Sequence, residues 1–258
     1  MFVLEHVSSI DSTNSELLRR ASLGPIHQRA VSADVQTTGR GQRGRRWYAE
    51  AGDAVLLSVG WTFSSSRRLD GLSLAVGLAV ARSVTNFSPD RITLKWPNDV
   101  LHEDRAKLAG VLVETVPHEG GGRSAVIGVG VNVRAPHPSN ATSFETDALP
   151  PAALVSTVLP RHADGATIIC NALRSALLNE LSLTLDRFEQ SGFGIFREEW
   201  WSRRAYANTP VRVFERGDAS GQSYVGRITA LDEGGALVID DGRALHTLHS
   251  GAVSLRPA

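Results

Sequence analysis

The sequence predicts an α+β protein of two domains, in which helices flank a central mixed, largely antiparallel sheet and a small β-barrel follows. Three observations support this prediction. The chain has 258 residues, enough for one large domain and one small domain. Strand-like and helix-like hydrophobic patterns alternate over residues 1–207. Residues 208–258 contain only short alternating strands between glycine-containing turns, which places the domain boundary near residue 207.

The first part of the chain predicts a helix between strands. Residues 2–7 are short and apolar enough for an opening strand. Thr13-Asn14-Ser15-Glu16 has the spacing of a capping box, and Gly24-Pro25 would end the helix. Residues 28–36 and 54–61 then form strands that would brace the segment between them. The apolar face of the helix consists of Leu17, Leu18 and Ala21.

The middle of the chain predicts a second helix and a hairpin. Ile92–Trp96 is a short strand that ends at Pro97, with Asn98-Asp99 in the turn after it. Residues 107–116 and 124–133 are apolar strands that could pair across the turn at 119–122. A helical face of small and apolar residues precedes them, namely Leu69, Leu72, Val76, Ala79, Val80 and Ser83.

The last part of the chain begins with an irregular crossing segment over residues 134–165, which is rich in proline and contains one helical turn near 152–159. A shorter helix covers 196–204, where Trp200 and Trp201 are packing residues. Between them lies a long amphipathic helix that ends at Gly192, with Ile168, Ile169, Leu173, Leu177, Leu181, Leu185 and Phe188 on one face. The barrel strands are 211–214, 224–231, 236–239 and 244–248, and closure would remove their exposed edges.

Composition limits the classes of function. The 27 basic and 27 acidic residues cancel, so a broad face for duplex nucleic acid is not expected. The lone Cys170 favours a reducing compartment and excludes an internal disulfide. The N-terminus has no secretory pattern and no apolar run reaches the length of a membrane span, so a cytoplasmic protein is expected. The eight histidines are scattered and read as ordinary polar residues.

Residues 36–47 combine backbone freedom with positive charge more than any other segment. Three glycines alternate with four arginines, and Trp47 follows. Glycines allow several N–H groups to converge, and guanidinium groups match carboxylate or phosphate oxygens. The loop is therefore a candidate anion cradle, although a solvated basic turn explains the composition equally well.

Five segments resemble biotin protein ligases. Gly39-Arg40-Gly41-Gln42-Arg43-Gly44-Arg45-Arg46-Trp47 is similar to the family's glycine- and arginine-rich loop, and Asp11-Ser12-Thr13-Asn14 precedes it. The other three are Lys95–Leu101, Lys107–Glu114 and Gly128–Val133. The resemblance implies a catalytic fold like that of class II synthetases, an SH3-like C-terminal barrel, and the short type of enzyme without an N-terminal DNA-binding domain. No helix-turn-helix unit fits before Asp11.

The resemblance also implies an activity. Biotin and ATP would be the substrates, with Mg²⁺, and biotinyl-5′-adenylate would transfer its acyl group to a lysine of a biotin carboxyl carrier protein domain. The catalytic residues would be Arg40, Lys95, Asp99 and Lys107, with Asp99 the candidate magnesium ligand. Biotin would contact Ser12, Thr13, Gln36, Gly39, Arg40, Lys107 and Gly110. ATP or the adenylate would contact Asn14, Arg40, Arg43, Arg45, Trp47, Lys95, Asn98, Lys107 and Asn132.

One position departs from the family pattern, because Gln42 stands where an arginine is usual. A neutral amide keeps hydrogen bonding but loses the charge, so weaker retention of the adenylate is expected. Two other readings stay open. A lipoate ligase uses the same acyl-adenylate chemistry, and a nucleic-acid-binding module could use arginines and Trp47 to grip a single strand. Family members often pair through sheet edges, which leaves a homodimer open; neither DNA nor a membrane is an expected partner.

Overall fold

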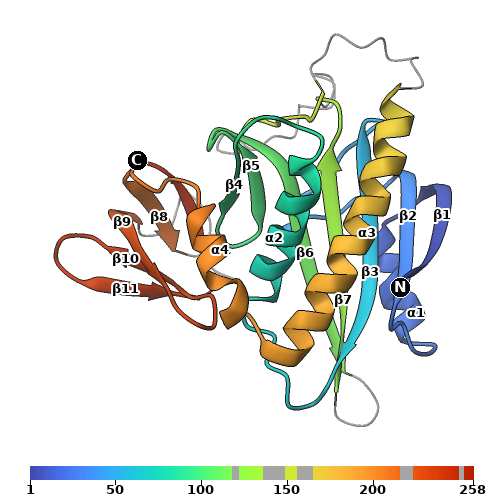
Figure 1. Cartoon of the computed structure of the whole chain (residues 1–258), viewed down its shortest axis with the longest axis horizontal. Coiled ribbons are helices and arrows are strands. Elements are labelled where there is room, and N and C mark those ends of the chain that lie inside the picture. The colour runs from blue at the N-terminus through green and yellow to red at the C-terminus, as the bar shows by residue number, and fades with distance from the viewer. Residues whose placement is uncertain (118–121, 136–148, 156–164, 216–222, 250–252) are drawn as a thin grey trace.

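The computed structural model describes residues 1–117, 122–135, 149–155, 165–215, 223–249 and 253–258 (Figure 1). Its large sheet has the strands β1 (Val3–Ile10), β2 (Arg29–Gln36), β3 (Ala54–Phe63), β4 (Ile92–Lys95), β5 (Asp99–His102), β6 (Ala106–Pro117) and β7 (Arg123–Asn132). They follow the order β1-β2-β3-β7-β6-β5-β4. β1 and β2 are parallel and the other neighbours in this order are antiparallel. The predicted mixed, largely antiparallel sheet is confirmed.

Two helices cover one face of this sheet. They are α2 (Leu72–Thr85) and α3 (Gly165–Ser191), which pack together across the strands (Figure 1). The predicted apolar stripe of α3 is buried at every fourth position from Leu173 to Leu185. Ile168 was wrongly assigned to this stripe and is 65% exposed. The reason is geometric, because each residue rotates about 100° around a helix and only Ile169 lies in line with Leu173.

The opposite face is covered by α1 (Thr13–Ala21), whose Leu17 packs on Val31 of β2 and Val126 of β7. The predicted capping box began one residue too late. Ser12 is the N-cap, and its side chain accepts the Ser15 N–H at 3.4 Å. Thr13 is the first helical residue, and its N–H, which has no partner inside the helix, donates to Gln36 Oε1 at 2.8 Å.

Two segments between strands differ from the sequence prediction. Asp99 opens β5 and is not only a turn residue, because it pairs directly with Lys95 across the β4–β5 hairpin. Residues 152–155 are not helical, since Pro151 forms a bridge with Lys107 and the chain runs beside β6. Residues 156–159 of the predicted helical turn, and 119–121 of the predicted hairpin turn, lie outside the described residues.

The end of the chain forms a second, antiparallel sheet in the order β11-β10-β9-β8-β12. Its strands are β8 (Val211–Glu215), β9 (Ser223–Leu231), β10 (Leu237–Asp240), β11 (Leu245–Leu248) and β12 (Val253–Pro257). Four of them were predicted; β12, which pairs with β8, was not. β11 and β12 are the two ends of this order, so the predicted closure of the sheet into a barrel stays a prediction.

The two sheets meet through the segment after α3. The helix η3 (Gly194–Phe196) and α4 (Arg197–Ser202) lead to residues 203–205, which hydrogen-bond to the backbone of Leu94 at the edge of β4. Trp96, only 2% exposed, donates its indole N–H to the Gly235 carbonyl at 3.0 Å. This hydrogen bond attaches the turn before β10 to the end of β4, where Lys95 lies. The domain limits 1–207 and 208–258 stay a prediction.

Within the described residues, no helix is long and apolar enough to cross a membrane.

The packing of α3 in the core on the α2–α3 face can be tested with a matched pair of residues. Leu181 of α3 is fully buried, whereas Leu183, two residues along, is 53% exposed. Leu181→Ala should lower the free energy of unfolding in urea by about 2–5 kcal/mol, since it leaves a cavity. Leu183→Ala should change it by less than about 0.5 kcal/mol; similar losses for both would contradict this packing of α3.

Candidate active site

A pocket lies over the α1 face of the large sheet, and glycines form its floor. Gly110 of β6 pairs directly with Gly130 of β7, and Gly128 lies two residues along the same strand. Residues two apart in a strand share a face, so this side of the sheet has a patch without side chains. The empty space over this floor is about 470 Å³, which includes the open solvent at the pocket mouth.

The glycine floor allows three side chains to lie against the backbone. A Cβ at Gly130 would come 2.6 Å from Cε2 of Trp47, and one at Gly128 would overlap Oδ1 of Asn14. A Cβ at Gly110 would come 3.1 Å from Nζ of Lys107. The close approach of these groups therefore requires glycine at the floor positions.

A β-bulge places Lys107 over this floor. Val100 pairs with Ala109, but the next residue, Leu101, pairs with Lys107, so Leu108 is an extra residue in β6. Lys107 and Gly110 are three residues apart and would face opposite sides of a regular strand. The extra residue reverses the alternation and brings Lys107 to the pocket face, an effect known for bulges next to functional sites.

Lys107 shares a buried carboxylate with Lys95. Lys107 Nζ lies 2.6 Å from Asp99 Oδ1, and Lys95 Nζ lies 3.0 Å from Oδ2. Burial disfavours the charged carboxylate, but the two ammonium groups outweigh this effect and hold the pKa of Asp99 well below its usual range. These are the only two lysines in a chain with 25 arginines, and both converge on one carboxylate.

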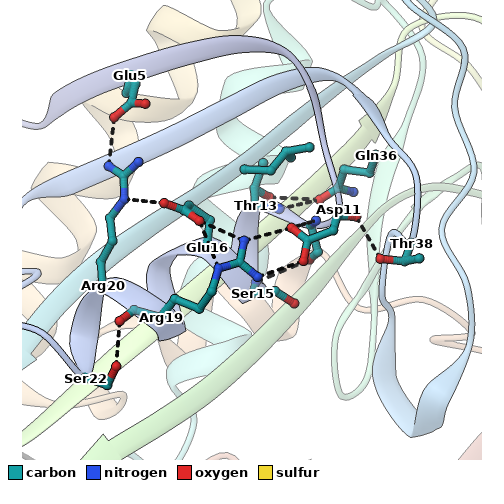
Figure 2. A network of polar contacts seen from close by, with 12 residues as sticks. Glu5, Asp11, Thr13, Ser15, Glu16, Arg19, Arg20, Ser22, Gln36 and Thr38 are labelled. Carbon is teal, nitrogen blue, oxygen red and sulfur yellow. Dashed lines mark hydrogen bonds and ion pairs between the residues drawn. The ribbon is translucent and has the colours of Figure 1, made fainter.

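The other end of the pocket is neutral and hydrogen-bonding. Gln36 Oε1 accepts from the Thr13 N–H at 2.8 Å and lies 3.1 Å from the Thr13 hydroxyl oxygen (Figure 2). Ser58 of β3 lies 2.7 Å from that hydroxyl and donates to Asn14 Oδ1 at 2.6 Å. Ser12, Thr13, Asn14 and Ser58 are all buried.

The glycine- and arginine-rich loop is tied to the body at its start and in its middle. The Asp11 carbonyl accepts from the Thr38 N–H and hydroxyl, and the Asp11 carboxylate binds Arg19 of α1 (Figure 2). The Arg19 hydrogen bond lowers the pKa of Asp11 to about 2, so this tie is charged at neutral pH. Further along, Arg40 Nη2 lies 2.6 Å from Glu114 of β6.

Most of the predicted site residues converge. Nine line the pocket, namely Ser12, Thr13, Asn14, Gln36, Arg40, Trp47, Asn98, Lys107 and Gly110. Lys95 and Asp99 lie beside the pocket, because Asp99 contacts Lys107, which lines it, and Lys95 contacts Asp99.

The remaining predicted residues are not in the lining. Gly39 packs against the backbone of Trp47. Asn132 donates to the carbonyls of Lys107 and Ala152. Arg45 is exposed on the loop, and the Arg43 side chain lies outside the described part of the chain.

Sequence reasoning assigned no role to four residues of this region: Ser58, Glu114, Gly128 and Gly130. The two glycines carried a usable signal, because glycines two apart in an apolar strand leave one face bare. Glu114 ends one of the segments that resemble the family, but its contact with Arg40, 74 residues away, left no local signal, and Ser58, 44 residues from Asn14, had none.

Neutral hydrogen-bonding groups and paired cations in one pocket fit a ligand that combines an uncharged polar part with an acid group. The chain matches the Biotin/lipoate A/B protein ligase family over residues 7–132. It is 33% identical over 256 residues to the biotin–[acetyl-CoA-carboxylase] ligase of Mycobacterium tuberculosis, covering 97% of this chain and 88% of that protein. It is 31% identical over 251 residues to the bifunctional ligase/repressor BirA of Escherichia coli, covering 96% and 73%.

Solved structures agree with this assignment. A variant of the biotin protein ligase from Aquifex aeolicus, in complex with biotin, superimposes with a TM-score of 0.77 at 25% identity, and each chain is covered completely. The chain therefore belongs to the biotin/lipoate A/B protein ligase family, and its near-full-length relatives place it among the biotin protein ligases.

The glycine floor can be tested with one methyl group. Gly130→Ala should displace the Trp47 ring, since no Cβ fits 2.6 Å from it, and weaken pocket ligands by about tenfold or more. Gly24→Ala is a matched control, because nothing lies within 4 Å of its Cβ position. Calorimetry with biotin measures the affinity and circular dichroism confirms folding. Equal affinity for both variants would show that the floor does not limit the pocket.

Proposed function

We propose that this protein activates biotin with ATP to biotinyl-5′-adenylate, releasing pyrophosphate, and then transfers the biotinyl group to a lysine of a biotin carboxyl carrier protein. The observation that carries the proposal is the arrangement of the pocket. Neutral hydrogen-bonding groups lie near Gly128, Lys107 lies over Gly110, and Arg40 also lines the pocket. Biotin has the matching shape, with a ureido ring at one end and a carboxylate at the other.

The cationic end supports acyl-adenylate formation. Two anions, the carboxylate and the α-phosphate, must meet for the reaction, and they repel each other. Lys107 can neutralise both as they approach, and Arg40 adds forked donors from the loop. Lys95 supports Lys107 because both share Asp99, which keeps the lysine pair at one net positive charge. Arg40, Lys107, Lys95 and Asp99 are thus proposed as the catalytic group.

The neutral end supports biotin rather than lipoate. The proposed biotin contacts are Ser12, Thr13, Gln36 and Gly39, with Gly110 lining the floor. Buried polar groups cost roughly 1–3 kcal/mol each when they are left without partners. The dithiolane ring of lipoate has no N–H or carbonyl to offer Thr13 and Gln36, whereas a ureido ring has both. Competition between the two acids in the adenylation assay separates these substrates.

For the nucleotide, we propose that Trp47 stacks on adenine and that Asn14, Asn98, Asn132, Arg43 and Arg45 contribute contacts. The Trp47 indole N–H is buried and has no partner among the described residues, which suits a loop that rearranges when ligand arrives. Closure of the loop over the adenylate would exclude water.

Magnesium is proposed as the partner of the ATP phosphates. Among the described residues, no three His, Cys, Asp or Glu side chains gather into a metal site. Both oxygens of Asp99 lie against lysine ammonium groups, which would repel a divalent cation. This arrangement favours Asp99 as the group that orients the two lysines over a role as magnesium ligand.

The partner we propose is a carrier domain of acetyl-CoA carboxylase or a related carboxylase, as the names of the relatives suggest. The single buried Cys170 supports a reducing, cytoplasmic location. A homodimer through a sheet edge is compatible with the exposed side chains of β1. No DNA partner is proposed, because the net charge is zero.

The direct test incubates the protein with biotin, MgATP and a purified carrier domain and follows the carrier's mass. We expect one biotinyl group on the carrier. Lys107→Ala should lower adenylate formation by at least about 1,000-fold, since it removes the cation at the developing charge. Thermal unfolding of the variant reports whether the remaining Lys95–Asp99 pair maintains the fold. Normal adenylate formation by folded Lys107→Ala would exclude the proposed role.

The neutral Gln42 generates a prediction of its own. Gln42 lines the pocket at a loop position where related enzymes usually have arginine. A charge-assisted hydrogen bond contributes roughly 1.5–3 kcal/mol, so Gln42→Arg should slow adenylate release by about tenfold or more. Release is measured by trapping free adenylate after dilution. Equal release rates for the two proteins would show that residue 42 does not contact the adenylate.

A further inference from the structure

Glu114 is a carboxylate beside the pocket that the proposed reaction does not use. It lies on β6, and its Oε2 accepts from Arg40 Nη2 at 2.6 Å and from Asn14 Nδ2 at 3.0 Å. A carboxylate near a site for two anions would be unfavourable unless it served another purpose. Its two partners are a loop residue and a helix residue, so it connects both to the central strand.

The contact with Glu114 determines which way the Asn14 amide points. An ionised carboxylate paired with arginine can only accept hydrogen bonds, so the Asn14 NH₂ must face Glu114. The amide oxygen then faces Ser58, whose hydroxyl donates to it at 2.6 Å. The bare backbone at Gly128 allows the amide to lie in this place.

The same reasoning determines the Thr13 hydroxyl. Two hydroxyl protons, from Thr13 and Ser58, serve three oxygen–oxygen contacts of 2.6, 2.7 and 3.1 Å. Ser58 uses its proton on Asn14, so the 2.7 Å contact requires Thr13 to donate to Ser58. The 3.1 Å contact, in which Thr13 is the donor to Gln36 Oε1, competes for the same Thr13 proton. Whether Ser58 or Gln36 receives it, the Thr13 proton is used inside the protein, and the Thr13 oxygen is left as an acceptor.

We propose that Glu114 is a positioning residue that holds Arg40 beside the pocket and, through Asn14 and Ser58, sets the Thr13 hydroxyl as a hydrogen-bond acceptor toward the ligand. The proposal rests on the proposed function and deepens it, because it states which chemistry the neutral end selects. Thr13 accepts from a ring N–H of the ligand. A ring that offers only acceptors at this position faces an acceptor and is rejected.

Replacing Glu114 by glutamine separates this role from simple support. A glutamine has the same shape and can still accept from Arg40, but its NH₂ can also donate. The Asn14 amide is then free to reverse, Ser58 can accept from it, and Thr13 can turn its proton to the ligand. Selection for a ring N–H is relaxed, although the fold and the size of the pocket are unchanged.

The experiment compares two ligands by calorimetry: biotin and its cyclic carbonate analogue, in which oxygen replaces both ring N–H groups. The wild-type protein should prefer biotin by about tenfold or more, because an unmade buried hydrogen bond is costly. Glu114→Gln should reduce this preference several-fold. Glu233→Gln is the control, since it removes the same charge from an exposed turn outside the pocket lining. It should retain the wild-type ratio.

Ser58→Ala is a second, independent test, because it removes the Ser58 hydroxyl that contacts Thr13 and leaves the charge of Glu114 unchanged. It should also reduce the preference for biotin. An unchanged ratio in both folded variants would overturn the proposal, as would tighter biotin binding by Glu114→Gln, which would show that Glu114 competes for Arg40. If the wild-type protein does not bind biotin, the proposed function itself fails. If it binds biotin and the ratios are unchanged, only the role of Glu114 is refuted.

Discussion

The whole site depends on a close approach of side chains to bare backbone. Gly110, Gly128 and Gly130 lie on adjacent central strands and leave the pocket face of the sheet without side chains. Asn14, Trp47 and Lys107 come from three different elements and occupy this space. Side chains alternate between the two faces of a strand, so the residues between the glycines point to the α2–α3 core and are apolar. The glycines on the pocket face are therefore compatible with a stable sheet. One set of strands therefore supplies both the binding floor and the packing surface.

Electrostatics at the cationic end follows from this floor and from one bulge. The extra residue Leu108 brings Lys107 to the same face as Gly110, where it meets Asp99. A buried carboxylate is costly unless it is paired, and two lysines together pair it while keeping one positive charge. The turn that joins Lys95 to Asp99 carries Trp96, whose indole is bound to the second sheet. The C-terminal sheet thus supports the hairpin on which this charge arrangement is built.

The sequence was most informative where interactions are local. The spacing of apolar residues predicted the long helix that became α3, and the hairpin of β6 and β7 was placed within one residue at its inner ends. The loop glycines, Lys107 and Thr13 were found by motif. The bulge at Leu108, the partner of Glu114 and the hydroxyl contact between Ser58 and Thr13 were not found. They arise only when strands distant in sequence become neighbours, and no local pattern encodes such pairing.

The glycine- and arginine-rich loop is attached to the rest of the protein at its start, and its tip is hydrogen-bonded within itself. Its start is fixed by Thr38 on Asp11, and the Trp47 N–H returns to the Gly39 carbonyl. Its tip closes on itself, because the Gly41 N–H donates to Arg45 and Gly44 has a positive φ. Gln42 lies at the start of that tip and lines the pocket. A neutral residue there reduces the charge that the tip can bring to a bound phosphate, while Arg40, held by Glu114, remains in place. Residue 42 therefore adds no charge to the pocket, and among the described lining residues the positive charge is carried by Arg40 and Lys107.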